Sequence, residues 1–221
     1  MADSSFFALL DRTKYIARSG LMRSSIPENV QEHSMQVSVL AHALATIGRD
    51  LFGKAIDPSE IAAAALYHDC SEIFTGDLPT PVKYKNDRLS GAYKDAELDA
   101  KERLFAMLPE ERQAGFADVI FFEERQPERY RYIKAADKLS AYIKCLNELS
   151  GGNGEFKKAA AALELENLKR VEGELEWFTL KFDYRNDGKP WGNSKDAPDR
   201  AINKLMGACV GEEAEMPAHN D

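Results

Sequence analysis

The sequence is poor in cysteine and lacks any long apolar run. Its three cysteines are widely spaced and form no C-x-x-C pair, which argues against a disulfide framework and against a zinc site built on thiolates. No stretch of about eighteen apolar residues is present, and no basic segment followed by an apolar one opens the chain. We therefore expect a cytoplasmic protein that has no contact with a membrane.

Positive charge is also scarce. The chain has 29 lysines and arginines against 37 aspartates and glutamates, a formal net charge of −8. A protein that wraps nucleic acid needs a broad basic surface to displace counterions, so we expect no nucleic-acid partner. A small anionic substrate remains compatible with this charge if a metal ion and a few local cations receive it.

Signatures of several other fold and enzyme classes are missing. The sequence has no Gly-rich phosphate loop, no G-x-S-x-G elbow and no stretch of strand-like alternation. The 221 residues are 44% hydrophobic. A chain of this size can bury roughly 70% of its unfolded surface in one core. We predict an all-α fold with a single domain over residues 1–206 and a disordered acidic tail over residues 207–221.

Periodic apolar residues predict the helices, and caps and breakers predict their ends. Residues 25–28 resemble a capping box before the second helix, Asp57 and Pro58 open the third, and Gly20 ends the first. Arg18 would lie in the last turn of the first helix, where a cation complements the helix dipole. The predicted helices cover residues 6–18, 29–50, 58–75, 90–108, 110–122, 131–144, 155–182 and 201–206.

The third predicted helix changes character along one face. Ile61, Ala65, His68 and Glu72 follow at steps of four, three and four, so the face is apolar at its start and ionisable at its end. Asp69 stands next to His68. Burial of such groups requires a compensating charge or a ligand, so this stretch is the first candidate for a functional site.

A second histidine lies on an apolar stripe of the preceding helix. His33 is followed by Val37, Leu40 and Leu44 at steps of four, three and four, which directs it toward the interior. By itself, such a histidine is more often a satisfied core residue than a ligand. His42 lies off this stripe, and we interpret it as structural or exposed.

Asp137 is the third candidate. It shares a helix face with Ile133 and Ala141, and an aspartate among apolar neighbours needs a partner. An ion pair with Lys134 or Lys138 would supply one, and a metal ion would also do so.

Together these candidates supply two imidazoles and two carboxylates from three helices. Such a donor set suits Mn²⁺, Co²⁺, Fe²⁺, Ni²⁺ or Zn²⁺ and leaves coordination positions for water and a substrate oxygen. Adjacent residues on a helix point about 100° apart, so an ion shared by His68 and Asp69 would have to lie between their directions. The predicted metal ligands are His33, His68, Asp69 and Asp137.

These residues resemble the H…HD…D signature of the HD-domain metal-dependent phosphohydrolases. Beyond that signature, residues 67–84 contain the His-Asp doublet, then Ser-Glu, then Gly-Asp-Leu-Pro-Thr-Pro. This run resembles the corresponding segment of the YfbR-type bacterial 5′-deoxynucleotidases, as do residues 6–8, 21–23 and 141–146. The resemblance covers about residues 5–182.

The resemblance implies a homodimeric helical bundle of the HD-domain type that hydrolyses 2′-deoxyribonucleoside 5′-monophosphates. It implies one divalent metal ion, Co²⁺ or Mn²⁺, with Fe²⁺, Ni²⁺, Zn²⁺ and Mg²⁺ as alternatives. Glu72 would be the acid/base group, Arg18 would orient the phosphate, and Asp77 would meet the sugar or the reacting centre. The implied substrate-binding residues are Arg18, Ser19, His33, Asp69, Asp77, Leu78, Pro79, Thr80 and Asp137.

The chain departs from the family pattern at one place in this pocket. Ser19 and Gly20 stand where the family has tryptophan and proline. The family's tryptophan packs against the sugar, so selectivity for deoxyribose over ribose stays open here, as do base preference and the metal used.

Two further functions remain open from the sequence. One is a non-catalytic nucleotide-binding or regulatory module, in which a metal ion only ties helices together. Such a module would need neither the proton carrier Glu72 nor the phosphate clamp Arg18. The other is hydrolysis of a nucleoside triphosphate or a cyclic nucleotide.

Overall fold

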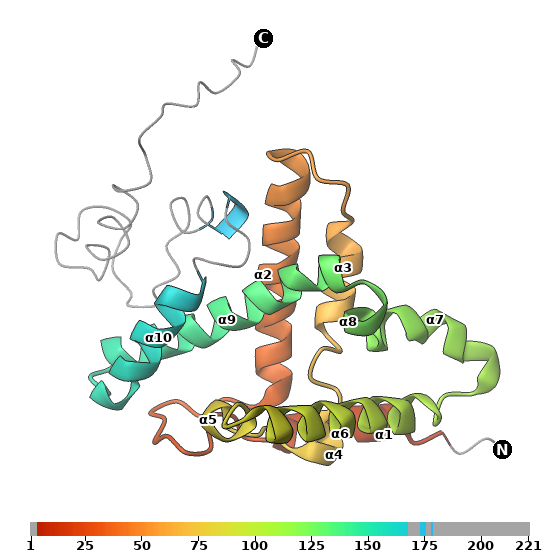
Figure 1. Cartoon of the computed structure of the whole chain (residues 1–221), viewed down its shortest axis with the longest axis horizontal. Helices are drawn as coiled ribbons and strands as arrows, with labels where there is room; N and C mark the ends of the chain where they lie inside the picture. The colour runs from red at the N-terminus through yellow and green to blue at the C-terminus, as the bar shows by residue number, and fades with distance from the viewer. Residues whose placement is uncertain (1–3, 168–172, 176–177, 179–221) are drawn as a thin grey trace, which may run out of the picture. The chain divides into compact units, whose positions relative to one another are not determined.

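The computed structural model describes residues 4–167, 173–175 and 178, and these residues are predominantly helical (Figure 1). Within them the structure has no strand, only an isolated antiparallel bridge between Ala17 and Asn29. The prediction of an all-α fold is therefore confirmed. The elements are α1 (Phe6–Leu10), η1 (Asp11–Tyr15), α2 (Val30–Asp50), α3 (Pro58–Ala65), α4 (Glu72–Thr75), α5 (Thr80–Lys83), α6 (Asp87–Phe105), α7 (Glu110–Ile120), α8 (Phe122–Arg125), α9 (Pro127–Ser150), η2 (Gly154–Phe156) and α10 (Lys157–Asn167).

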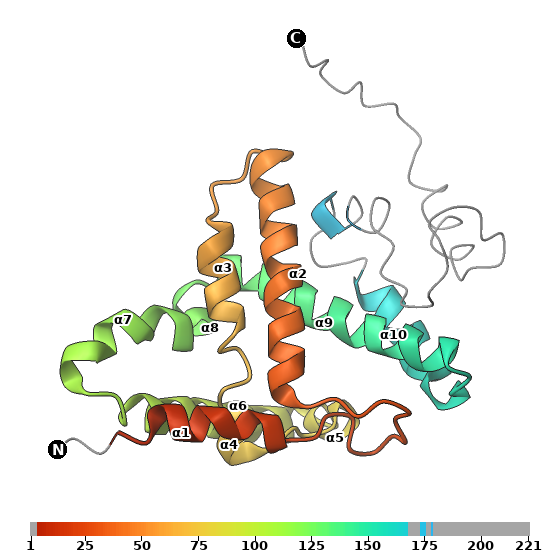
Figure 2. The same ribbon diagram turned by 180° about the vertical axis from the view of Figure 1, so that it is seen from behind.

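The main core lies between α2, α3 and α9. Figures 1 and 2 show α2 beside α3, with α9 crossing them. Leu44, Ile61, Ile133 and Leu139 are fully buried there. Because burial of one such side chain contributes about 1.5–3 kcal/mol, this cluster fixes α2 and α9, which carry His33 and Asp137, and α3, which ends three residues before His68.

A second apolar cluster supports the turn that follows α3. Phe6 of α1, Leu104 of α6 and Ile120 of α7 are buried together with Cys70. In both ribbon views α1, α4, α5 and α6 gather at the N-terminal end of α2 (Figures 1 and 2). Cys70 therefore anchors the chain immediately after the His-Asp doublet.

The first helix is shorter than predicted. It ends as a 3₁₀ turn at Tyr15, and Ile16 is already extended, so the prediction of a helix through Arg18 is wrong. Two backbone hydrogen bonds between separate parts of the chain use N–H and C=O groups that would otherwise bond within the helix. Val30 N donates to Ile16 O at 3.0 Å, and Arg18 N donates to Glu28 O at 2.9 Å.

The start of α2 also differs from its prediction. The capping box uses Asn29 and Glu32, with Glu32 N donating to Asn29 Oδ1 at 2.9 Å, instead of residues 25–28. Glu28 cannot cap because its carbonyl bonds Arg18 N and its carboxylate lies against the Arg18 side chain. The cap of α3 is as predicted, since Ser59 N donates to Asp57 Oδ1 at 2.8 Å and Pro58 follows.

The predicted single helix over residues 58–75 is interrupted. α3 ends at Ala65, residues 66–71 form tight turns, and α4 is a separate single turn. The His68 side chain accounts for the break, because its Nδ1 lies 2.8 Å from Ala65 O, the carbonyl that a continuing helix would offer to Asp69 N. His68 and Glu72 therefore do not share one continuous helix face.

Later boundaries shift by a few residues. α6 begins at Asp87 because the Asn86 side chain accepts from Leu89 N at 2.8 Å, and α9 begins earlier than predicted, at Pro127. Of the helix predicted for residues 155–182, α10 covers 157–167, and Leu175 and Phe178 are buried. The remaining predictions, including the helix at 201–206, the domain end at 206 and the tail, lie outside the described residues. No helix among the described residues is long and apolar enough to cross a membrane.

Candidate active site

His68 presents an unprotonated nitrogen to the interior. Its Nδ1 lies 2.8 Å from Ala65 O, and because a carbonyl oxygen only accepts, Nδ1 carries the proton. Its Nε2 is buried without a hydrogen-bond partner. This Nε2 lies 3.1 Å from Asp69 Oδ2, so a lone pair and a carboxylate converge at one point.

His33 is held in the same tautomer by a different route. Ser140 Oγ donates its only proton to Gln36 Oε1 at 2.6 Å, so it can only accept from His33 Nδ1, 3.2 Å away. His33 Nε2 is thereby left as a lone pair. It lies 3.1 Å from Asp137 Oδ1 and 3.7 Å from Asp69 Oδ2.

These converging acceptors fit a divalent cation. The ligand atoms of His33, His68 and Asp69 lie within 4.8 Å of one another. Asp137 lies outside this group of three, although its Oδ1 is 3.1 Å from His33 Nε2. Lone pairs and carboxylates repel one another in a buried site unless a positive charge lies between them. Two imidazole nitrogens and two carboxylates suit a transition-metal ion of the predicted kind.

One alternative for Asp137 is wrong. Lys134 Nζ donates to Glu123 Oε1 at 2.8 Å, and the described contacts include no ion pair between Lys134 and Asp137. Asp137 instead contacts His33.

Arg18 joins this cluster from the loop before α2. Its Nη1 lies 3.3 Å from Asp69 Oδ2 and its Nε lies 3.1 Å from Glu28 Oε1. Burial alone would lower the pKa of Arg18, but the charges of Asp69, Asp137 and Asp77 raise it. A guanidinium that stays charged beside a cation site is suited to an anionic group that bridges the two.

Glu72 is the buried acid of the site. Only 7% of it is exposed, and its Oε2 has no hydrogen-bond partner. Burial, followed by the charges of Asp69 and Asp77, raises the pKa of Glu72 to about 9. A carboxyl group that keeps its proton at neutral pH can serve as a general acid.

The remaining predicted pocket residues lie on two loops. Asp77 follows Gly76, whose φ of 70° favours glycine, and Leu78 and Pro79 are half-buried while Thr80 is exposed. This loop is fixed to α6, since Tyr93 donates to Gly76 O at 3.1 Å. Ser19 lies on the other loop, with a φ of 58° that is unusual for a residue other than glycine.

Sequence reasoning missed three polar residues of the site: Glu28, Gln36 and Ser140. A signal existed for two of them, because Gln36 follows His33 by three positions and Ser140 follows Asp137 by three, which places each pair on one helix face. The sequence around Glu28 predicts a helix cap, and nothing local distinguishes that role from a bond with Arg18. His42 is exposed, as predicted.

Comparisons with known proteins agree with the fold. Residues 5–183 match a family model described as 5′-deoxynucleotidase YfbR-like. A 5′-deoxynucleotidase of Vibrio parahaemolyticus is 48% identical over 182 residues, covering 82% of this chain and 94% of that protein. The 5′-deoxynucleotidase YfbR of Salmonella arizonae is 46% identical over 182 residues, covering 82% and 92%.

Solved structures share the fold at lower identity. An HD-domain phosphohydrolase from Listeria innocua superimposes with a TM-score of 0.68 at 22% identity, over 82% of this chain and 88% of that one. The HD phosphohydrolase DatZ of cyanophage S-2L, solved with dA and one catalytic Zn²⁺ ion, gives a TM-score of 0.57 at 22% identity, over 77% and 91%.

Proposed function

This chain belongs to the YfbR-like 5′-deoxynucleotidase family, and on that premise we propose that it hydrolyses deoxyribonucleoside 5′-monophosphates to nucleoside and phosphate. The observation that supports the reaction most directly is the pair of imidazole lone pairs, on His33 and His68, directed at Asp69 and Asp137 beside Arg18. In this proposal the four form the site of one divalent cation, with Co²⁺ or Mn²⁺ preferred and Zn²⁺ supported by its presence in the cyanophage protein.

When bound, such a cation lowers the pKa of water and neutralises charge on phosphoryl oxygens. The chain's own residues do the rest. Arg18 donates from Nε to Glu28 and with one Nη1 hydrogen to Asp69. Its other N–H groups are available to hold the phosphate. Glu72 holds a proton in a buried position and can deliver it to the departing 5′-oxygen. Asp77, Leu78, Pro79 and Thr80, with Ser19 opposite, are proposed to line the nucleoside pocket.

A non-catalytic binding module is the second candidate. A metal ion that only tied α2, α3 and α9 together would need neither a buried proton donor nor a guanidinium beside its ligands. The buried carboxyl group of Glu72, whose Oε2 has no hydrogen-bond partner, and the contact of Arg18 with Asp69 both favour the enzyme.

A phosphate-release assay separates these functions. The chelated protein, reloaded in turn with Co²⁺, Mn²⁺ and Zn²⁺, is given deoxy- and ribonucleoside monophosphates, a triphosphate and a cyclic nucleotide. We expect phosphate release from deoxyribonucleoside monophosphates in the reloaded protein and none in the chelated one. Tight nucleotide binding without phosphate release would favour the binding module, and release confined to the other substrates would contradict the proposed substrate class.

Ser19→Trp is expected to increase the preference for deoxyribose over ribose. Tryptophan would present a flat apolar surface to the sugar, against which a 2′-hydroxyl is poorly accommodated. Position 19 has a φ of 58°, but the strain of this conformation comes from Cβ and is already present with serine, so the exchange adds little backbone cost. The measurement is the ratio of kcat/KM for dAMP and AMP, with Ser150→Trp at an exposed position of α9 as the control. An unchanged ratio would place sugar selectivity elsewhere.

Ser140→Ala is expected to weaken metal binding by about 10–100-fold, because His33 loses the group that accepts from its Nδ1. The measurement is a calorimetric titration of the chelated protein with Co²⁺. Ser150→Ala is the matched control on the same helix, because Ser150 bonds only to Asn147 O in the described structure. Equal affinity in wild type and Ser140→Ala would contradict the assigned tautomer of His33.

We also propose that the protein is a homodimer. Phe7, Met35 and Leu66 are large apolar side chains that are 63%, 59% and 46% exposed, and all three line a cavity of about 430 Å³ that also reaches Asp69. Exposed apolar side chains gathered around one hollow are typical of an interaction surface. Light scattering tests the proposal, with Met35→Glu expected to shift a dimer toward the monomer and a monomeric wild type contradicting it.

A further inference from the structure

Arg18 is carried at the base of a loop, residues 19–28, that leaves the helical body and returns to it. The base is closed by the bridge between Ala17 and Asn29 and by the bond from Arg18 N to Glu28 O at 2.9 Å. The same two residues pair through their side chains, with Arg18 Nε 3.1 Å from Glu28 Oε1. The course of this loop therefore decides where the guanidinium lies.

Apolar burial holds little of this loop. Leu21 and Ile26 are 69% and 66% exposed, and of its apolar side chains Met22 is the one that packs against the main core. Ser19 has a φ of 58°, a conformation that costs about 1–3 kcal/mol and persists only where the surroundings enforce it. Some other interaction must hold the loop in place.

Polar groups from the end of α9 and the turn after it supply that interaction. They belong to Lys144, Glu148 and Asn153, and we call these three residues the clamp. They bind backbone atoms of the loop at three residues. Ser25 N and Ile26 N donate to Glu148, at 2.8 and 3.2 Å, and Ile26 O accepts from Lys144. Arg23 O accepts from Asn153 Nδ2 at 2.7 Å.

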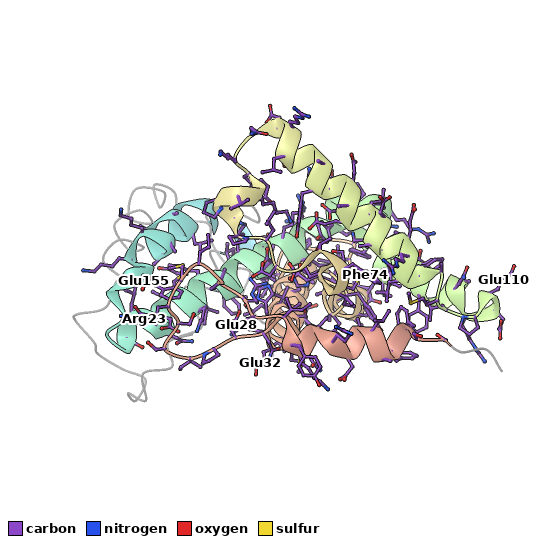
Figure 3. The ribbon with its side chains drawn as sticks, turned by 90° about the horizontal axis from the view of Figure 1, so that it is seen from below. Arg23, Glu28, Glu32, Phe74, Glu110 and Glu155 are labelled. Carbon is purple, nitrogen blue, oxygen red and sulfur yellow. The ribbon has the colours of Figure 1, made fainter. Side chains whose placement is uncertain are left out.

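A further contact lies at the edge of this clamp. Arg23 N donates to Glu155 Oε1 at 3.3 Å. Figure 3 shows Arg23 on the loop near Glu155, while Glu28 lies where the loop returns to α2. Because the contacts are to the backbone, they fix the path of the loop whatever side chains it carries.

Glu148 is the centre of this clamp. It is 2% exposed and its carboxylate also accepts from Lys144 Nζ at 2.6 Å and Asn153 Nδ2 at 2.8 Å. Burial alone would raise its pKa, but the bonds from Lys144, Asn153 and the two loop amides lower it. A buried charge satisfied by four donors, two of them on the loop, gives a rigid attachment.

We propose that Glu148 is a positioning residue for the substrate: by fixing the backbone of residues 23–26, it aims Arg18 at the phosphate. The proposal rests on the proposed function, because it takes the phosphate group as the partner of Arg18. Glu148 touches neither the metal ligands nor Glu72 among the described contacts, so its effect passes through the loop alone.

Glu148→Gln is the main test. The variant keeps the size of the side chain, but its amide group turns one acceptor into a donor, so it cannot satisfy the loop amides, Lys144 and Asn153 together. We expect KM for dAMP to rise about tenfold with a smaller change in kcat, because a misplaced binding group costs affinity first. Co²⁺ content should stay at the wild-type value. Trypsin, which cuts after Arg23 in the exposed part of the loop, should cleave the folded variant faster than wild type.

Two more variants keep the test decisive. Asn153→Ala removes a bond to Arg23 O and a bond to Glu148 from a half-buried position. It therefore tests the clamp even if Glu148→Gln does not fold. It should raise KM and speed tryptic cleavage, as expected for Glu148→Gln. Glu128→Gln, an exposed glutamate in the first turn of α9, should change neither.

The two readouts separate the clamp from the reaction. Unchanged tryptic cleavage in both variants overturns the clamp, and faster cleavage with unchanged KM overturns the positioning role. Absence of phosphate release by the wild type is a failure of the proposed function and is seen before any variant is made.

Discussion

Glu72→Gln is expected to lower turnover by about 10²–10⁴-fold, the range for loss of a general acid or base, without loss of metal. Glutamine has nearly the shape of the protonated acid but has no proton to deliver to the leaving oxygen. Turnover is measured by phosphate release, and metal content by elemental analysis of the same sample. Glu102→Gln, an exposed position on α6, is the control. Wild-type turnover in Glu72→Gln would remove Glu72 from the chemistry.

The same substitution is expected to stabilise the metal-free protein, increasingly so as the pH rises. Burial and the charges of Asp69 and Asp77 raise the pKa of Glu72 from 4.5 to about 9. A carboxyl group with a raised pKa in the folded state contributes stability that is fully present below pH 4.5 and is lost as the pH rises toward 9. Glutamine does not titrate, so its advantage in the free energy of unfolding should reach on the order of 3 kcal/mol near pH 7.

Thermal unfolding of both metal-free proteins at pH 5 and pH 8 measures this difference. The gap in Tm should be larger at pH 8. A gap that does not change with pH would contradict the raised pKa of Glu72. Lower stability of the variant at both pH values would show that the carboxylate has a partner in the folded protein.

Asp69→Asn is the second change with a large expected effect. Asp69 Oδ2 lies 3.1 Å from His68 Nε2, 3.7 Å from His33 Nε2 and 3.3 Å from Arg18 Nη1, so one carboxylate oxygen joins both imidazoles and the guanidinium. Removing its charge takes away a ligand. We expect loss of bound metal and a fall in turnover of about 10³-fold or more, since a metal ion contributes several kcal/mol to such a reaction.

The matched control for this variant is Asp95→Asn, an exposed aspartate of α6. It should keep the metal content, turnover and Tm of the wild type. Retention of both metal and turnover by Asp69→Asn would contradict the proposed ligand set. Loss of turnover with metal fully retained would assign Asp69 to substrate binding alone.

The approach of His33 and Asp137 could be predicted because both positions follow helical periodicity. The stripe through His33 and the face through Asp137 lie on α2 and α9, long helices whose apolar sides must meet in any compact arrangement. Once both sides are inward, His33 and Asp137 lie close together, with Asp137 Oδ1 3.1 Å from His33 Nε2. Periodicity carries this information because it depends only on the side of a helix that is buried.

The break between α3 and α4 could not be predicted in this way. The apolar and ionisable residues from Ile61 to Glu72 keep a helical spacing, yet the His68 side chain takes the carbonyl of Ala65 and turns the chain. Local side-chain bonds of this kind compete with the helix without disturbing its pattern. The consequence is functional, because the turn lets two adjacent residues face one point, which an unbroken helix would resist.

Contacts between residues far apart in the sequence could not be predicted either. Glu148 bonds the backbone of Ser25 and Ile26, more than 120 positions earlier, and a single sequence holds no trace of which loop a distant carboxylate will meet. The same is true of Glu28, whose place before α2 favoured a cap. Its carboxylate instead pairs with the Arg18 side chain, because the chain leaves the helix before Ile16 and a backbone bond brings Arg18 beside Glu28.

The proposed reaction depends on one cation held by His33, His68, Asp69 and Asp137. A Co²⁺ titration of the chelated protein, with phosphate release from dAMP followed in parallel, tests this dependence most directly. We expect turnover to be absent without metal and to rise in proportion to bound Co²⁺ until one ion per chain is reached. Full turnover in the chelated protein, or one Co²⁺ bound with equal affinity by wild type and Asp69→Asn, would contradict it.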